Sequence, residues 1–375
     1  MLKPFLFLAC LFNPGSLLAQ YKVHLKIDQR PLAHSQDSVY AAGSFNNWVP
    51  GDREKVFTSS GEGKLFLDLN LAAGNFQYKI TRGNWNTVEA SADGKGIGNR
   101  ECNVSSDTTI VLKVAAWNDD FKGNVQKKHT SSPQVTVMDT AFMMPQLDRS
   151  RKIWLYLPIG YATSKKRYPV IYMHDGQNLF DEFTSGNGEW GIDECLDSLH
   201  KKGKDCIIVG IDNGPKRITE YNPYDFGKYG KGEGYAYIDF LVESLKPYID
   251  QHYRTLKDKS HTIIAGSSLG GLISMAAVMR YPATFGGAGI FSPAFWIAPQ
   301  LEIDLAKSAP LVNSKLFFYA GIKESKEMVP DMKRIENILS TSTKSDLKEV
   351  LDGEAKHNES AWRKYFPNFI TWILR

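Results

Sequence analysis

The stretch "IIAGSSLGGL", residues 263–272, decides the fold of the larger part of this chain. It places two adjacent serines among glycines, directly after an apolar run that is typical of a buried strand. The pattern Gly-x-Ser-x-Gly needs a glycine two positions before and two positions after the serine. Gly266 and Gly270 meet that requirement for Ser268, whereas the register centred on Ser267 has no glycine at either position. Ser268 is therefore the candidate nucleophile.

This turn requires small residues for a steric reason. A strand that turns sharply into a helix forces strained dihedral angles on the serine, and only small neighbours let the two segments pass. The hydroxyl of Ser268 then stands out at the helix N-terminus, where the backbone N–H of Leu269 is free to stabilise an oxyanion. The alternative is a plain strand–helix turn without a chemical role, because the short pattern alone is common.

A serine nucleophile needs a base, and the base needs an acid that orients it. In folds with this turn the chain order is serine, acid, histidine. The chain has eight histidines, and only His357 follows Ser268. His357 lies in the polar stretch "DGEAKHNESAW" before the last predicted helix, so an exposed loop residue is the alternative. The chain order favours His357 as the base.

The acid is expected after the predicted strand "LFFYAG", and Glu324 lies just beyond it. Glu327, Asp331 and Asp352 are rival carboxylates. We expect Asp331 in the first turn of the next helix, where it favours the helix dipole, and Asp352 in a turn before a glycine. Glu324 is the preferred acid on its loop position.

A second oxyanion donor is expected in the loop after an earlier strand. The stretch "YMHDGQNLFD", residues 172–181, fits, with Gly176 and Gln177 at the turn. His174 and Asp175 precede them, but no partner ligands stand at metal spacing. The sequence therefore predicts neither a metal site nor a cofactor.

The pattern of apolar and polar residues differs between successive parts of the chain. Residues 134–375 alternate apolar strands with amphipathic helices, which predicts an α/β fold with a mostly parallel sheet and helices on both faces. Ligands of such sheets bind at the carboxyl ends of the strands. Residues 20–116 show short strands and frequent turn residues, which predicts a small all-β sandwich. Residues 117–133 are polar and aperiodic, which predicts a linker.

Length and composition set the class of protein. A chain of 375 residues with 42% hydrophobic residues has room for two globular domains. The net charge of +4, from 45 basic and 41 acidic residues, is too weak and too interspersed to indicate nucleic-acid binding. Besides Cys10 the chain has Cys102, Cys195 and Cys206, which are too few for a disulfide framework. Cys195 falls on a helical face beside leucines and Cys206 opens an apolar run, so we expect both in the core.

Residues 1–19 have the pattern of a secretory signal peptide. Lys3 is followed by an apolar segment from Phe5 to Phe12, which is too short to span a bilayer, and a cut after Ala19 fits. Lipidation at Cys10 is the alternative. We expect an exported protein of a bacterial periplasm or medium, without a membrane span.

Five stretches together carry a family resemblance: "RKIWLYLP", "YPVIYMHDGQNLFD", "IDNGPKRITEYNP", "AGSSLGG" and "HNESAW". With them, residues 140–375 resemble the esterase D-like branch of the α/β-hydrolases. That branch includes carbohydrate esterase family 1, with its feruloyl and acetyl xylan esterases, and the enterochelin esterases. The resemblance implies Ser268 as nucleophile, His357 as base and Glu324 as acid, although many relatives have aspartate at the acid position.

The first domain resembles a glycogen- or starch-binding module of the immunoglobulin-like type, through "GSFNNWVPGD", "GNFQYKITRG" and "GNRECNV". The resemblance implies sugar contacts at Trp48, Lys79 and Trp85. Ala90 stands where some starch binders place a tryptophan, and Trp48 has core packing as an alternative role. A module that binds another polysaccharide, or that only packs, stays open.

The leading hypothesis is a secreted serine esterase that removes feruloyl or acetyl groups from plant polysaccharide or oligosaccharide. The alternatives are a siderophore esterase, for which Arg217 would meet an anionic or catecholate ligand, and a catalytically silent carbohydrate-binding protein. Arg217 has a surface ion pair with Glu220 as its structural alternative. The sequence leaves the acyl group, the glycan and the oligomeric state open. Four residues are candidates to line the substrate pocket: Trp190, Arg217, Tyr221 and Trp296.

Overall fold

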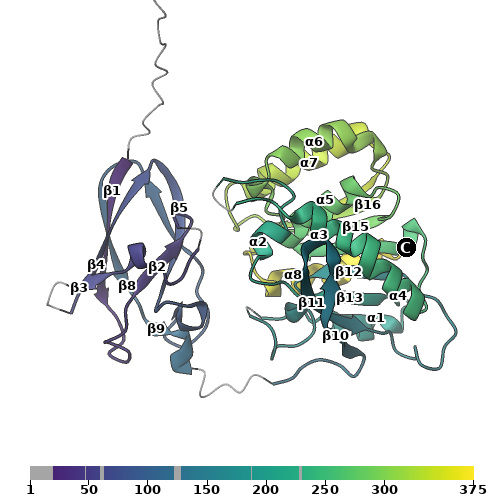
Figure 1. The fold of residues 1–375 in the computed structure, drawn as a ribbon, viewed down its shortest axis with the longest axis horizontal. Coiled ribbons are helices and arrows are strands. Elements are labelled where there is room, and N and C mark those ends of the chain that lie inside the picture. The colour runs from purple at the N-terminus through teal and green to yellow at the C-terminus, as the bar shows by residue number, and fades with distance from the viewer. Residues whose placement is uncertain (1–19, 47, 60–62, 122–127, 187, 228–229) are drawn as a thin grey trace, which may run out of the picture. The chain divides into compact units, whose positions relative to one another are not determined.

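The computed structural model describes residues 20–46, 48–59, 63–121, 128–186, 188–227 and 230–375. The predicted signal peptide, with Cys10, lies outside the described residues. Internal contacts divide the chain into two compact units, Met1–Gln126 and Lys127–Arg375 (Figure 1). None of the helices in the described ranges is long and apolar enough to cross a membrane.

The first unit is built from strands. A four-stranded sheet has the order β3-β4-β1-β8, a three-stranded sheet the order β2-β5-β7, and β6 pairs with β9. Alternate residues of β1, such as Val23, Leu25 and Ile27, are buried in a common apolar core, as expected for strands with one face inward. The strands are β1 (Gln20–Gln29), β2 (Tyr40–Gly43), β3 (Thr58–Ser59), β4 (Leu65–Ala72), β5 (Gly74–Thr81), β6 (Glu89–Ala90), β7 (Arg100–Val104), β8 (Thr108–Lys113) and β9 (Ala116–Trp117).

The predicted linker is shorter in the structure. Trp117 belongs to β9 and is buried in the core of the first unit, and a 3-10 turn follows at Asn118–Phe121. On the other side, the Thr130 hydroxyl donates to Glu189 at 2.8 Å, so this segment packs on the second unit. The prediction of a linker over 117–133 is therefore wrong at both ends, because this polar segment includes a residue buried in the first unit and one bonded to the second.

The second unit contains an eight-stranded sheet with the order β10-β11-β13-β12-β14-β15-β16-β17. The pairs β10–β11 and β11–β13 are antiparallel and the others are parallel, which confirms the predicted mostly parallel α/β sheet. Every residue of the central strands is buried, as parallel strands covered on both faces require. The strands are β10 (Val135–Met144), β11 (Arg149–Tyr156), β12 (Val170–His174), β13 (Ile207–Ile211), β14 (Thr262–Ser267), β15 (Gly287–Phe291), β16 (Lys315–Gly321) and β17 (Asp346–Asp352).

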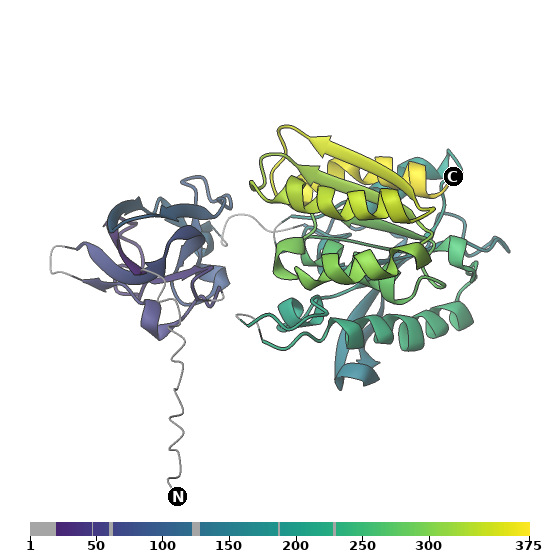
Figure 2. The ribbon, with the colours of Figure 1, turned by 90° about the horizontal axis from the view of Figure 1, so that it is seen from above.

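Helices cover both faces of this sheet (Figures 1 and 2). One apolar cluster joins the sheet to α3, α5, α6 and α7, and a second joins it to α1 and α8. A π-turn at Leu241–Leu245 connects α3 to α4. The helices are α1 (Ile192–His200), α2 (Arg217–Glu220), α3 (Gly234–Phe240), α4 (Lys246–His252), α5 (Leu269–Arg280), α6 (Gln300–Ser308), α7 (Met328–Ser342) and α8 (Glu359–Ile373).

A buried ion cluster ties α2 to β11. The carboxylate of Glu220 is fully buried and accepts hydrogen bonds from Arg149, at 2.6 Å, and from Arg151. Glu220→Ala leaves two guanidinium groups without their buried partner, and we expect it to lower the free energy of unfolding by about 3–5 kcal/mol. Glu354→Ala, which breaks an exposed pair with Lys323, is the control and should change stability little. Urea unfolding measures both variants, and equal effects would contradict the role of burial.

Candidate active site

Ser268 lies between β14 and α5 in a strained conformation. Its φ of 58° and ψ of −120° are unusual for a residue with a side chain. A Cβ on Gly266 would come within 2.9 Å of the Gly270 carbonyl carbon and of His174 Cδ2, so only glycine fits there. The structure therefore has the strand–turn–helix geometry that the Gly-x-Ser-x-Gly register predicts, and strain of this kind is typical of functional sites.

The segment after β15 holds the backbone of Ser268 from both sides. The Ser268 N–H donates to the Phe291 carbonyl at 2.9 Å, and the Ala294 N–H donates to the Ser268 carbonyl at 3.0 Å. Because β14, β15 and β16 are parallel, the residues that follow them lie at one edge of the sheet. Ser268 and Glu324 therefore share the edge where α/β proteins bind their ligands.

His357 and Glu324 are joined directly. The distance from His357 Nδ1 to Glu324 Oε2 is 2.6 Å. The Glu324 side chain is only 1% exposed, whereas His357 is 37% exposed and sits in the turn before α8. A buried carboxylate thus fixes one ring nitrogen of a histidine whose other nitrogen is left for chemistry. Among the described residues, no hydrogen bond joins the Ser268 hydroxyl to this histidine.

The rival carboxylates are engaged elsewhere. Asp331 lies in the first turn of α7, as expected, and pairs with Arg334 at 2.8 Å. Asp352 ends β17 and pairs with Lys364 at 2.8 Å. Glu327 is exposed and directly precedes α7. Of the four carboxylates weighed from the sequence, the structure brings only Glu324 to His357.

The loop after β12 turns tightly at Gly176. A Cβ on Gly176 would lie 2.8 Å from Trp154 Cδ1 and 2.9 Å from the Gly210 carbonyl carbon. Gln177 follows in a short 3-10 turn, and its carbonyl accepts a hydrogen bond from Thr184 at 2.8 Å. Across the site, Leu269 opens α5, so its N–H has no acceptor within the helix. Both predicted donor positions lie at the carboxyl ends of strands β12 and β14.

His174 packs beneath the turn rather than beside the reacting atoms. It is buried, its Nδ1 lies 2.9 Å from the Tyr237 hydroxyl, and burial lowers its pKa to about 3. The ring is therefore neutral at ordinary pH and cannot act as a switchable base. No group of three or more histidine, cysteine, aspartate or glutamate side chains in the described ranges is arranged to hold a metal.

Arg217 does not form the surface ion pair considered from the sequence. Its guanidinium makes two bonds to Asp175, at 2.7 and 2.8 Å, and Asn213 donates to the same carboxylate at 2.6 Å. Burial alone would raise the pKa of Asp175, but the guanidinium outweighs it and lowers that pKa. The arginine is committed to holding the Asp175–Gly176 turn, which argues against a direct role in binding an anionic ligand.

Two of the four predicted pocket residues belong to the core. Tyr221 is 0% exposed beneath His174, and Trp190 is buried against Phe291 and Trp362. The prediction that they line the pocket is wrong, because aromatic residues in loops also fill gaps under those loops. Trp296 is 53% exposed and follows the segment that holds Ser268, so it remains a candidate to contact substrate.

Glu359 was not predicted as a site residue, although it lies in the quoted "HNESAW" stretch. It is the first residue of α8, its carboxyl is buried, and Asn178 Nδ2 donates to it at 3.4 Å. Burial raises its pKa from 4.5 to about 7. No pattern in the sequence marks Glu359 as a buried carboxyl next to the loop of Gly176.

The raised pKa of Glu359 has a consequence for stability. The folded state binds this proton more tightly than the unfolded state, so the free energy of unfolding falls as pH rises through about 4.5 to 7. Glu359→Gln should remove part of this fall, measured by thermal unfolding between pH 4.5 and 8. The exposed Glu354→Gln is the control, and a slope in Glu359→Gln equal to that of the wild type would contradict the prediction.

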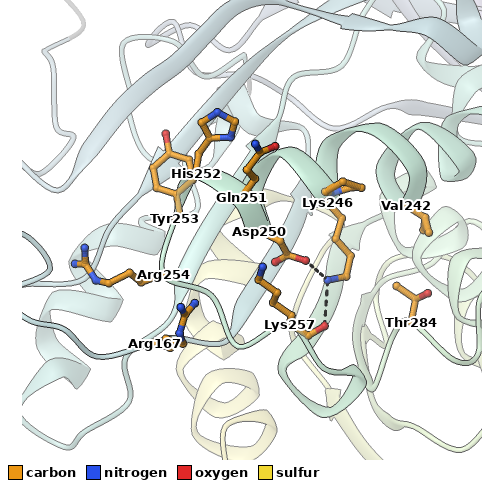
Figure 3. A pocket seen from close by; sticks show the side chains of 11 residues that line it. Arg167, Val242, Lys246, Asp250, Gln251, His252, Tyr253, Arg254, Lys257 and Thr284 are labelled. Carbon is orange, nitrogen blue, oxygen red and sulfur yellow. Dashed lines mark hydrogen bonds and ion pairs between the residues drawn. The ribbon is translucent and has the colours of Figure 1, made fainter.

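A separate cavity of about 790 Å³ lies away from this site (Figure 3). It is lined by residues of α4 and of the segments on either side of it, including Val242, Tyr253, Arg254 and Lys257, with Arg167 and Thr284 from segments that precede β12 and β15. It therefore lies at the amino ends of the strands, opposite Ser268. Two of its cations are engaged within the fold, since Lys246 donates to Asp250 at 2.6 Å and Arg167 donates to a backbone carbonyl.

In the first unit the two predicted sugar-contacting tryptophans are neighbours. The ring centroids of Trp48 and Trp85 are 6.3 Å apart, and Trp85 is exposed. Trp48 is half-buried with a positive φ of 59°, so it lies in a turn and not in the core. The ammonium of Lys79 donates to the Ile97 carbonyl, and burial lowers its pKa. Lys79 is thereby engaged within the unit.

A match to a family model shows that this chain belongs to a class of esterases. Residues 145–372 match the Esterase family, described as "Putative esterase". The chain is 26% identical over 245 residues to the uncharacterized protein YbbA of Bacillus subtilis, covering 60% of this chain and 92% of YbbA. It is 28% identical over 259 residues to an endo-1,4-beta-xylanase/feruloyl esterase of Xylanibacter ruminicola, covering 68% of this chain but 33% of that protein.

A likeness of fold extends further along the chain. The crystal structure of the enterobactin esterase of Shigella flexneri, in the presence of enterobactin, aligns with a TM-score of 0.52 at 15% identity. The alignment covers 94% of this chain and 92% of that one. This chain belongs to the Esterase family, and hydrolysis of carboxylic esters is its class of activity.

Proposed function

We propose that the protein is a serine esterase with Ser268 as nucleophile, His357 as base and Glu324 as orienting acid. The observation that carries the proposal is the 2.6 Å hydrogen bond from His357 to the buried Glu324, at the sheet edge where the strained Ser268 stands. A nucleophile, a base and an orienting acid from three separate loops are what acyl transfer needs.

In the proposed reaction, the Ser268 hydroxyl gives its proton to His357 Nε2 as its oxygen attacks the acyl carbon. The N–H groups of Leu269 and Gln177 hold the oxyanion of the tetrahedral intermediate. His357 then protonates the leaving alkoxide, and an acyl-enzyme remains on Ser268. Water repeats the sequence: His357 removes its proton, the acid is released, and Ser268 regains its hydrogen.

The proposed oxyanion donors predict that a substitution at Gly176 will lower activity. Gly176→Ala should lower kcat for p-nitrophenyl acetate about 10²-fold, because its Cβ meets the backbone of Gly210 and displaces the Gln177 N–H. Gly186→Ala is the matched control in the same loop, since a Cβ there meets nothing within 4 Å. Steady-state kinetics on both variants provide the test. Equal kcat in Gly176→Ala and the wild type would remove the loop from the proposed mechanism.

The proposed substrates are acylated carbohydrates, with feruloyl or acetyl groups as the acyl part. The similarity to a xylanase/feruloyl esterase and the paired tryptophans of the first unit support this choice. Export to the periplasm or medium belongs to the same proposal, on the signal-like pattern of residues 1–19. Release of ferulate or acetate from arabinoxylan by the purified protein is the test, and failure on both would reject this substrate class.

A siderophore ester is the alternative substrate. Its support is the likeness of fold over 94% of the chain to an enterobactin esterase. The commitment of Arg217 to Asp175 counts against it, because this cation was the proposed contact for an anionic ligand. Hydrolysis of a catecholate trilactone, compared with feruloyl and acetyl esters in one panel, separates the two substrates.

A further inference from the structure

Ser292 is a buried serine directly after β15 that the proposed reaction does not use. It is 0% exposed, and its φ of 43° lies in the left-handed region. Its backbone N–H donates to the Tyr319 carbonyl at 2.6 Å. A non-glycine residue is strained in this conformation, so the presence of a serine here points to a use for the hydroxyl.

The hydroxyl of Ser292 contacts the carboxylate that orients His357. It donates to Glu324 Oε1 at 2.7 Å, and the Gly321 N–H donates to the same oxygen at 2.6 Å. Oε1 thus receives two donors, which leaves Oε2 for the imidazole at 2.6 Å. Two fixed donors on one oxygen set the rotation of the carboxylate and stabilise its charge.

Trp362 fixes the direction of the Ser292 proton. Its Nε1–H donates to Ser292 Oγ at 2.8 Å, and an indole nitrogen can only donate. Ser292 therefore accepts from the indole and has its own proton free for Glu324. The same indole ring contacts the imidazole of His357 edge-on, with ring centroids 5.1 Å apart.

The segment that carries Ser292 also holds the candidate nucleophile. Phe291 and Ala294, on either side of Ser292, bond the backbone of Ser268 at 2.9 and 3.0 Å. One four-residue segment thus contacts the nucleophile through its backbone and the acid through its side chain. We therefore expect a change at Ser292 to affect both Glu324 and Ser268.

We infer that Ser292, supported by Trp362, is a positioning residue that holds the Glu324 carboxylate in register with His357 and Ser268. The inference rests on the proposed function and deepens it. Ser292 is fully buried, and its hydroxyl contacts Glu324 and Trp362. Its loss should therefore lower kcat and leave KM unchanged, because substrate contacts stay intact while the base is misaligned.

The test uses Ser292→Gly in the full chain. Glycine accepts a positive φ without strain, so this variant removes the hydroxyl while favouring the fold. We expect kcat for p-nitrophenyl acetate to fall about 10- to 100-fold with KM and melting temperature unchanged. Ser314→Ala is the matched control, since Ser314 is also buried and hydrogen-bonded but lies at the opposite end of β16.

A double-mutant cycle tests the Trp362 arm. Trp362→Phe keeps an aromatic ring against His357 but removes the N–H that orients Ser292. If both residues act through one hydrogen-bond chain, the double variant should lose about as much kcat as Ser292→Gly alone, and not the product of the two losses. Multiplicative losses would overturn the joint role.

Ser268→Ala is run beside these variants so that failures can be told apart. Full turnover in Ser268→Ala overturns the proposed function and this inference with it. Wild-type kcat in Ser292→Gly, beside an inactive Ser268→Ala, overturns this inference alone. A fall in kcat that merely follows a fall in melting temperature also overturns it, because that pattern indicates a structural role.

Discussion

Ser268→Ala is expected to lower kcat for p-nitrophenyl acetate roughly 10⁴- to 10⁶-fold, because without a nucleophile only binding and oxyanion stabilisation remain. The backbone at this position is strained at φ 58°, and alanine keeps that geometry nearly as serine does. KM should therefore change little. Steady-state hydrolysis, with circular dichroism to verify the fold, measures the effect.

Ser267→Ala is the matched control for this variant. Ser267 is the neighbouring serine, it ends β14 and its side chain is buried. It has glycines at neither required position, so its loss should leave kcat within a few-fold of the wild type, a tolerance typical of residues outside the reacting set. If Ser267→Ala were the inactive variant and Ser268→Ala the active one, the register argument would be wrong.

Glu324→Gln is expected to lower kcat about 10³- to 10⁴-fold while the fold is kept. A glutamine at this position can present its amide N–H to His357 Nδ1, which favours the wrong tautomer and removes the charge that stabilises the imidazolium. The effect should appear in kcat and not in KM, since Glu324 is buried away from solvent and substrate.

The rival carboxylates provide the controls. Glu327→Gln alters an exposed residue three positions further along the chain, and Asp352→Asn alters the partner of Lys364. Both should retain most of the wild-type kcat, and Asp352→Asn should cost at most a little stability. A loss of activity in either one that equals the loss in Glu324→Gln would reassign the acid.

The central α/β sheet could be predicted from the sequence because its strands are continuous apolar runs. Strand β14 and helix α5 are clear examples, since a fully buried strand with an apolar centre is followed by a glycine-rich turn and a helix of 12 residues. The edge strands β10 and β17 and the helix α6 are absent from the sequence prediction. Their residues are only partly buried, so the periodic pattern that marks an element is weak there.

The candidate site could be predicted only in part, for a related reason. The Gly-x-Ser-x-Gly register led to Ser268, the loop position to Glu324 and the chain order to His357, and the structure joins the last two directly. Ser292 could not be found in this way, because its contact with Glu324 depends on two parallel strands lying side by side. The prediction that Tyr221 lines the pocket is wrong, because the sequence does not distinguish an aromatic residue buried beneath a loop from one exposed on its surface.

Covalent trapping identifies the nucleophile without any assumption about the natural substrate. The full chain is treated with diisopropyl fluorophosphate, and the adduct is located by mass spectrometry of peptides. We expect a single adduct on Ser268, absent from Ser268→Ala and formed much more slowly in Glu324→Gln, because the oriented base activates the hydroxyl. An adduct on another residue, or equal labelling of Ser268→Ala, would show that Ser268 is not the nucleophile.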